Sequence, residues 1–318
     1  MALLVHYAQG LLMGGADIIP GVSGGTMALI VGIYERLIGS ISSAFSLVLA
    51  ILRANGEAIR RHGREVEWGL VLPLVLGIGS AIVVLAQFIP HLLEAYPHQM
   101  RGLFLGLVAA SIAVPWMRIG RMTLPLLAIA LVGAVVAFLI VGLPLLAPRP
   151  DPGLIRVFAS AAVAICAMIL PGVSGAFLLE VVGMYLPTTL ALSAAIRLDG
   201  SAILYVCVFV LGAATGLGMF SKTLNWLLSK YHDATMAALV GLMAGSLRAL
   251  WPWQRWDLNE RELLWPVAGD PVTSVIVLIL AGAAFVGALT WLGTRNRVVG
   301  ERYGGAMTED LEATSHSH

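Results

Sequence analysis

The sequence Ile19–Tyr34 reads IPGVSGGTMALIVGIY, and Leu170–Tyr185 reads LPGVSGAFLLEVVGMY, so one sixteen-residue stretch occurs twice. The copies lie 151 positions apart, and eight of the sixteen residues are identical (Pro, Gly, Val, Ser, Gly, Val, Gly and Tyr). Repetition at a fixed offset indicates that the chain consists of two similar halves. Each copy places Pro-Gly and Ser-Gly inside a long apolar stretch, where they interrupt a helix. Inside a bilayer, such an interruption requires protein or a water-filled cavity around the freed backbone groups.

The composition is that of a membrane protein. Of the 318 residues, 59% are hydrophobic and 12% are charged, and the mean hydropathy is +0.90. Soluble domains have about 45–50% apolar and about 25% charged residues. A net charge of +1 without a basic patch argues against a nucleic-acid partner. Cys166 and Cys207 lie in apolar segments without the spacing of metal or redox sites, so neither a metal nor a cofactor is expected.

The pattern of apolar segments predicts an all-α polytopic membrane protein built from two inverted repeats. Each repeat is expected to contain a re-entrant helical hairpin, which returns to its side of origin, and about three transmembrane helices. A second similarity, between LGLVAAS at 105–111 and VGLMAGS at 240–246, supports duplication of the whole half. Repeat one (1–147) has its hairpin at 3–37, an interfacial helix at 38–52 and spans at 68–90, 102–117 and 123–147. Repeat two (148–294) has its hairpin at 154–187 and spans at 202–228, 236–251 and 272–293, and a disordered cytoplasmic tail follows at 295–318.

The basic residues predict the orientation, because cytoplasmic loops carry an excess of Lys and Arg. With both termini cytoplasmic, twelve basic residues fall inside: Arg36, Arg53, Arg60, Arg61, Arg64, Arg118, Arg121, Lys222, Lys230, Arg295, Arg297 and Arg302. Seven fall outside: Arg101, Arg149, Arg156, Arg197, Arg248, Arg255 and Arg261. Three predicted spans separate the two hairpins, and an odd number of spans leaves the chain on the opposite side of the membrane. The first hairpin is therefore expected to enter from the cytoplasm and the second from outside.

The two hairpin tips are the candidate binding site. Ser23 and Ser174 stand where a helix N-cap is expected, and the adjacent glycines leave backbone N–H groups accessible. Each helix N-terminus carries about half a positive charge, so two of them facing one central region favour an anion such as phosphate. The alternative is that the serines only cap their own helices. The substrate-binding candidates are Pro20, Gly21, Ser23, Gly24, Gly25, Thr26, Pro171, Gly172, Ser174 and Gly175.

Two acids within the apolar segments are candidates for ion coupling, because intramembrane ionisable residues are usually functional. Asp17 lies three residues before Pro20, and Glu180 lies six residues after Ser174. An ionised acid beside an anion site is repulsive, and a proton-coupled or sodium-coupled carrier can use that repulsion. Alternatively, Asp17 accepts hydrogen bonds from exposed amides of its own hairpin. Weaker candidates are Glu35 and Arg36, expected as a surface pair, and Arg156 and Arg248, expected at the outer interface.

The runs GADIIPGVSGGTMALIVGIYERL (Gly15–Leu37) and AMILPGVSGAFLLEVVGMY (Ala167–Tyr185) resemble the polyprenyl-phosphate transporter family of bacteria. The resemblance extends to about Gly293. It implies a translocase in the inner membrane that returns undecaprenyl phosphate, the lipid carrier of cell-wall synthesis, from the outer to the cytoplasmic leaflet. The family motif falls on Asp17 and on the ten tip residues named above. In the second copy Ala176 and Phe177 replace Gly and Thr, which reduces the expected donors there.

Two other functions remain open from the residues. A membrane-embedded polyprenyl-diphosphate phosphatase also resembles inverted repeats, with a motif that begins Pro-Gly-x-Ser-Arg. Here Gly24 and Gly175 follow the two serines, and no arginine follows before Arg36 and Arg197. Cleavage of a diphosphate needs cations to stabilise its transition state, so a transporter rather than an enzyme is expected. A carrier of a small soluble anion differs from a lipid carrier in whether its cavity opens sideways to the bilayer.

Overall fold

The computed structural model describes residues 2–17, 23–85, 88–143, 152–172, 174–256 and 261–291. Within these ranges the chain is helical apart from turns, loops and one short two-stranded antiparallel hairpin. Seven of the described helical segments are long and apolar enough to cross a membrane. The prediction of an all-α polytopic membrane protein is therefore confirmed at the level of fold class.

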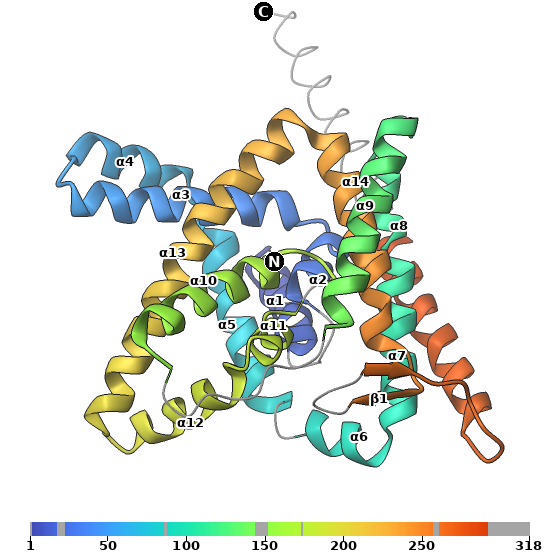
Figure 1. The fold of residues 1–318 in the computed structure, drawn as a ribbon. Coiled ribbons are helices and arrows are strands. Elements are labelled where there is room, and N and C mark those ends of the chain that lie inside the picture. The colour runs from blue at the N-terminus through green and yellow to red at the C-terminus, as the bar shows by residue number, and fades with distance from the viewer. Residues whose placement is uncertain are drawn as a thin grey trace, which may run out of the picture.

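The first half of the chain contains nine described helices (Figure 1). They are α1 (Ala2–Asp17), α2 (Gly24–Ile30), α3 (Tyr34–Leu52), α4 (Gly56–Glu65), α5 (Trp68–Leu85), α6 (Ile89–Ala95), α7 (Pro97–Ser111), α8 (Ala113–Met117) and α9 (Leu124–Val141). The second half contains α10 (Leu154–Ile169), α11 (Gly175–Val181), α12 (Tyr185–Ile196), α13 (Gly200–Lys230), α14 (His232–Ser246), the 3₁₀ helix η1 (Leu247–Leu250), β1 (Gln254–Trp256), β2 (Arg261–Leu263) and a last helix, Val272–Trp291.

The sequence repeat is also a repeat of local structure. The short helices α2 and α11 both have seven residues and begin 151 positions apart. Each ends before a glycine in the left-handed region, Gly32 at φ 77° and Gly183 at φ 68°, where L side chains are disfavoured. The next helices then begin at Tyr34 and Tyr185. After α11 the chain turns by 110° into α12, as a broken or re-entrant segment does.

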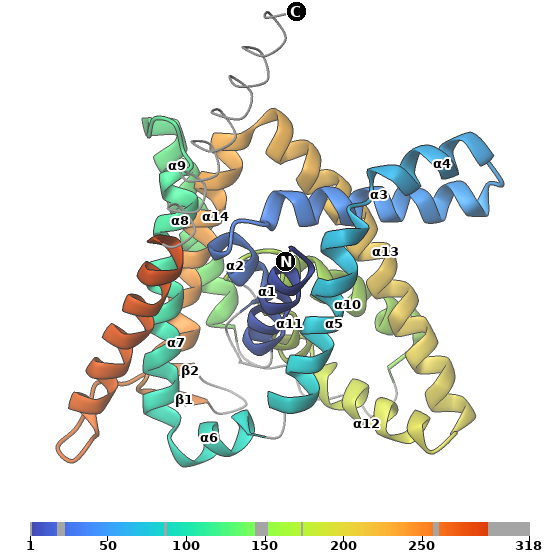
Figure 2. The ribbon, with the colours of Figure 1, turned by 180° about the vertical axis from the view of Figure 1, so that it is seen from behind.

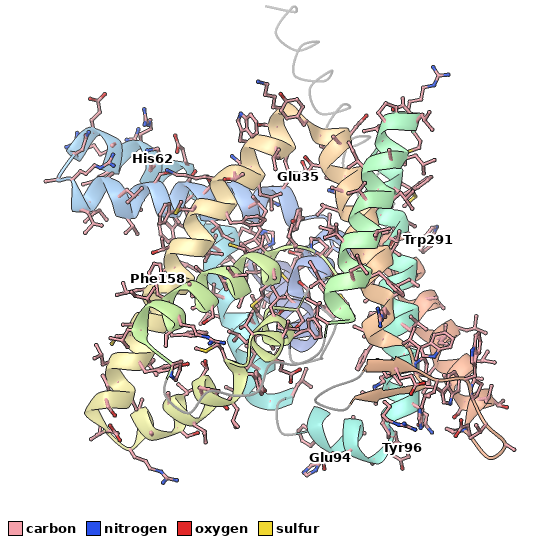
Figure 3. The ribbon with its side chains drawn as sticks, viewed as in Figure 1. Glu35, His62, Glu94, Tyr96, Phe158 and Trp291 are labelled. Carbon is pink, nitrogen blue, oxygen red and sulfur yellow. The ribbon has the colours of Figure 1, made fainter. Side chains whose placement is uncertain are left out.

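The loops fall into two groups at opposite ends of the molecule. Figure 1 places α4 and the α13–α14 turn at the upper end, and α6, α12 and the β-hairpin at the lower end. Figure 3 likewise places Glu35 towards the upper end and Glu94 and Tyr96 at the lower end. That these two ends lie on opposite sides of a membrane stays a prediction from the basic residues. Which end faces the cytoplasm stays a prediction.

The boundaries of several predicted elements differ from those observed. The first hairpin was expected to extend to 37, but α3 is one helix from Tyr34, because Gly32 ends the preceding turn. This helix is apolar and long enough to span a membrane, yet it lies crosswise to α5 (Figure 2), as an interfacial helix would. The span expected at 68–90 ends at Leu85, and α6 is a separate helix with Pro90 in its first turn. The predicted tail lies outside the described residues.

Close backbone contact defines the packing. In the first half α1 lies along α5, and in the second α10 lies along α13 (Figure 2). A β-carbon on Gly10 would lie only 3.0 Å from Cα of Gly77, and one on Gly212 only 2.9 Å from Cα of Phe158. Small residues at helix crossings are the usual means of packing helices in lipid. All seven residues of α2 are buried, which places the first hairpin tip inside the molecule.

Candidate functional site

The two hairpin tips contact each other directly. The Ser23 hydroxyl donates a hydrogen bond to the carbonyl of Met168 at 2.8 Å, and the Tyr34 hydroxyl donates one to the carbonyl of Ile169 at 3.3 Å. In return, the Gly172 N–H donates to Oγ1 of Thr26 at 3.1 Å. These three bonds join residues about 140 positions apart. The structure therefore brings the two copies of the repeated motif to one place.

The predicted N-caps are confirmed. Ser23 caps α2, and its Oγ accepts the N–H of Gly25 at 3.1 Å. Ser174 caps α11, and its Oγ accepts the N–H of Phe177 at 3.4 Å. Both side chains are buried. Each serine therefore satisfies a backbone donor at the start of its own helix, as an N-cap does.

Asp17 closes the first tip. It is the last residue of α1, and its Oδ1 accepts the N–H of Gly24 at 2.7 Å. The first two amides of α2, those of Gly24 and Gly25, are thus both bonded to side chains of their own hairpin. In this conformation the carboxylate of Asp17 occupies the position at the helix start where the sequence predicts a phosphate. The alternative interpretation, that Asp17 bonds an amide of its own hairpin, describes the contact observed.

The Pro-Gly pairs differ in what the structure describes. Pro20 and Gly21 lie outside the described residues. Pro171 and Gly172 are buried, and Gly172 has a φ of +86°. A β-carbon on Gly172 would lie 2.8 Å from Cα of Met243. Glycine is needed there both for the left-handed backbone and for the close approach to α14.

A cavity of about 490 Å³ begins at the first tip. Asp17, Gly24 and Gly25 line it at this end, and it continues between α1, α3, α5, α10 and α13. Most of its other lining side chains are apolar. Glu180 is partly exposed on α11 and is not among the residues that line this cavity, so the two predicted coupling acids lie in different surroundings.

The weaker candidates make structural contacts. Glu35 and Arg36 do not pair with each other: Glu35 accepts from Arg118 at 3.0 Å, and Arg36 bonds Glu67, whose pKa its guanidinium lowers. Neighbouring residues on a helix do not face each other, so the expected pair was wrong. Arg156 donates to the carbonyl of Val182 at 2.8 Å.

The arginine contacts at the short helices are similar in the two halves. Arg156 bonds the C-cap of α11, and Arg118 reaches the carbonyl of Leu29 in α2 at 3.4 Å. A cation at a helix C-terminus offsets the negative end of the dipole. Arg248 bonds the carbonyl of Phe138 at 3.2 Å and lies over its ring.

Sequence reasoning missed Tyr34 and Arg118. Tyr34 was visible as one of the eight identities of the repeat, since Tyr185 matches it. Arg118 carries no such signal, because its partners lie more than eighty residues away. In the described part of the chain, no three His, Cys, Asp or Glu side chains are grouped so as to hold a metal ion.

Comparison with known proteins identifies the family. Residues 13–262 match the model of a family described as undecaprenyl phosphate translocase-like. The chain is 37% identical over 306 residues to a polyprenyl-phosphate transporter of Vibrio cholerae, covering 90% of this chain and 96% of that protein. It is 29% identical over 299 residues to a polyprenyl-phosphate transporter of Staphylococcus aureus, covering 90% and 95%. No solved structure matches. The chain belongs to the undecaprenyl phosphate translocase-like family.

Proposed function

We propose that this protein translocates polyprenyl phosphate, and undecaprenyl phosphate in particular, from the outer to the cytoplasmic leaflet of a bacterial inner membrane. The observation that carries the proposal is the meeting of the two repeated hairpin tips beside a buried cavity. Interrupted helices at matching places in two halves are typical of transporter binding sites. The names of the Vibrio and Staphylococcus relatives support the lipid as substrate and transport as the activity.

The phosphate binds between the tips, held by amides and hydroxyls around Ser23–Thr26 and Ser174–Ala176. Several of these groups are bonded within the protein in the present conformation, so binding is an exchange of partners. Each of the three bonds between the tips is a neutral hydrogen bond with a net contribution of about 0.5–1.5 kcal/mol. Bonds to a phosphate are charge-assisted and stronger. The phosphate therefore replaces weaker internal bonds with stronger ones as the tips separate.

Asp17 couples this exchange to an ion. Its carboxylate and the phosphate are both anions that compete for the amide of Gly24. Two negative charges at one site repel each other unless one is neutralised by a proton or a nearby cation. A proton on Asp17, or a sodium ion beside it, therefore favours phosphate binding. Glu180 is the second candidate for this role, although it lies outside the cavity.

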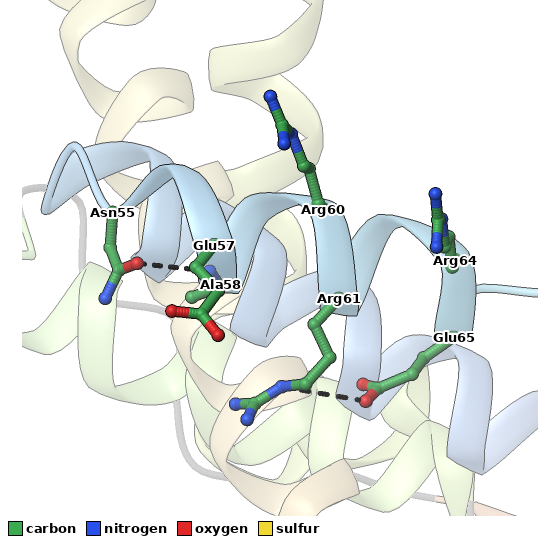
Figure 4. Close-up of a pocket in the computed structure, with 7 residues that line it drawn as sticks. All are labelled: Asn55, Glu57, Ala58, Arg60, Arg61, Arg64 and Glu65. Carbon is green, nitrogen blue, oxygen red and sulfur yellow. Dashed lines mark hydrogen bonds and ion pairs between the residues drawn. The ribbon is translucent and has the colours of Figure 1, made fainter.

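The basic residues support an orientation for the two groups of loops. We assign the end that carries α4 to the cytoplasm, because four arginines cluster between 53 and 64. Figure 4 shows Arg60 and Arg64 extending from the same side of α4. The two hairpins then enter from opposite sides, and the repeats are inverted.

Cysteine labelling tests this orientation. In a background without Cys166 and Cys207, an impermeant thiol reagent added to intact cells is expected to label Val267→Cys and not Arg60→Cys. Both positions are exposed, so permeabilised cells, in which both should react, serve as the control. Equal labelling of both in intact cells contradicts the arrangement.

Reconstitution distinguishes transport from hydrolysis. Purified protein in liposomes is expected to move undecaprenyl phosphate between leaflets and to release no inorganic phosphate from undecaprenyl diphosphate. The physical reason is that the residues directly after Ser23 and Ser174 supply no arginine to stabilise a cleavage transition state. Phosphate release that Ser23→Ala abolishes would instead establish the membrane phosphatase.

A further inference from the structure

We propose that the 490 Å³ cavity is the binding site for the isoprenoid chain of the substrate, whose phosphate lies at the hairpin tips. The proposal rests on the proposed function and adds where the first isoprene units are held. The volume falls within the range of about 300–1,000 Å³ that is usual for small-molecule sites. It is too small for the whole undecaprenyl chain, so the distal units stay in the bilayer.

The cavity lining is polar mainly at the hairpin tips and apolar elsewhere, as the structure of a phospholipid-like molecule requires. Among the described residues that line the cavity, three have polar side chains, namely Asp17, Tyr34 and Ser40. Asp17 and Tyr34 both lie at the tips, where Asp17 bonds Gly24 and Tyr34 bonds the carbonyl of Ile169. The remaining walls are aliphatic and aromatic side chains or glycines. A molecule with one anionic end and a long apolar body matches this arrangement, and a small hydrated anion does not.

The cavity opens sideways. Val48 on α3 and Val75 on α5 both line it, and their exposed fractions are 51% and 58%. Ala214 on α13 also lines it and is exposed. α5 and α13 are apolar helices that are long enough to span a membrane, so their exposed faces at Val75 and Ala214 contact lipid tails rather than water, and α3, which lies crosswise to α5, borders the opening. A chain already in the bilayer can therefore enter between α3, α5 and α13 without leaving an apolar environment.

The sideways opening also accounts for how the phosphate reaches the tips. The apolar body of the lipid follows the cavity while the phosphate meets the polar end beside Asp17. Burial of each methylene in the cavity removes it from a less closely packed lipid environment and adds dispersion contacts. The isoprenoid chain thereby orients the headgroup, as substrate parts remote from a reacting centre commonly do.

Filling the cavity tests the proposal without altering the tips. Ala44→Trp and Ala214→Trp place an indole in the cavity from α3 and from α13, at positions that are partly or fully exposed and can accept a larger side chain. The matched control is Leu131→Trp, on α9, whose side chain is 63% exposed and does not line the cavity. Binding of undecaprenyl phosphate in detergent should weaken at least about tenfold in the two filled variants, since the indole removes the dispersion contacts of several chain carbons with the cavity wall, which together correspond to roughly that factor. The control should bind like the parent.

A photoreactive prenyl phosphate with a diazirine on its second isoprene unit gives an independent readout. In the parent it is expected to crosslink to peptides of α3 and α13. If the filled variants bind undecaprenyl phosphate as tightly as the parent and the crosslinks fall elsewhere, the chain site is wrong although the proposed function stands. If the parent itself does not bind undecaprenyl phosphate, the proposed function fails. If dioleoyl phosphatidate competes equally well, the cavity accepts any acyl chain, and the isoprenoid assignment is overturned.

Discussion

Gly25→Val is expected to abolish translocation. A β-carbon at this position would lie 2.5 Å from the carbonyl oxygen of Ile169, which belongs to the other hairpin. Backbone cannot yield as a flexible side chain can, so the tips must separate and their three hydrogen bonds are strained or lost. Overpacking of this kind typically costs about 1–3 kcal/mol. The branched side chain also blocks the approach of a phosphate to the amides of α2, so binding and transport should both fall by more than tenfold.

The glycine substitutions form a graded series. Gly175→Val is expected to be similarly severe, because its β-carbon would lie 2.6 Å from the carbonyl oxygen of Ala164. Gly24→Val should be milder, since the nearest atoms are those of the Asp17 carboxylate, which can move. Gly69→Val is the control, with nothing within 4 Å of the added carbon. Leaflet exchange in liposomes and headgroup binding measure the series. Folded Gly25 and Gly175 variants that bind the lipid phosphate like the parent would place the site elsewhere, with Arg156 and Arg248 next to examine.

Asp17→Asn is expected to remove the dependence of transport on an ion gradient. The asparagine keeps an oxygen that can accept the N–H of Gly24, so the cap and the fold should survive. It carries no charge, so no proton or cation is needed when phosphate arrives. Gradient-driven accumulation should therefore fall to the level of passive exchange, while passive exchange itself persists.

Glu180→Gln is the matched comparison. Because Glu180 does not line the cavity, its neutralisation should leave the gradient dependence of transport unchanged. Rates measured in liposomes across a pH or sodium gradient, with each variant beside the parent, separate the two acids. Loss of the dependence in Glu180→Gln alone would transfer the coupling role to α11. Gradient dependence that persists in both variants would give both acids structural roles.

Sequence patterns over a few residues predicted much of the site, but they could not predict hydrogen bonds between residues that are far apart in the sequence. The N-caps at Ser23 and Ser174 follow from capping chemistry and from glycines a few residues away, so the sequence was sufficient to find them. The bond from Ser23 to the carbonyl of Met168 spans 145 positions and uses a backbone group that every residue has. No residue type signals such a partner. The bond from the Gly24 amide to Asp17 joins residues of the same hairpin, and it remained one of two alternatives because an acid in an apolar segment is equally a candidate for ion coupling.

Boundaries and charges were less predictable than the repeat. The sequence does not show that Gly32 has a left-handed backbone, which ends the turn after α2. The predicted boundary at 37 therefore falls inside α3, which is continuous from Tyr34. In the described part of the loop at 251–271, β1 pairs with β2, and Gln254 lies opposite Leu263, a short pairing with weak apolar alternation. Arg36 on α3 bonds Glu67, which lies between α4 and α5. Each of these depends on how separate helices meet.

The glycine crossing of α1 with α5 has a mechanical consequence. Gly10 and Gly77 bring the two backbones together without an intervening layer of side chains, and Gly212 does the same for α10 and α13. Surfaces packed this closely do not slide gradually past one another, because every small displacement meets backbone atoms. Each helix pair is therefore expected to move as one rigid unit. Relative movement of the two pairs would therefore act on the three hydrogen bonds that join the hairpin tips rather than on the helix crossings.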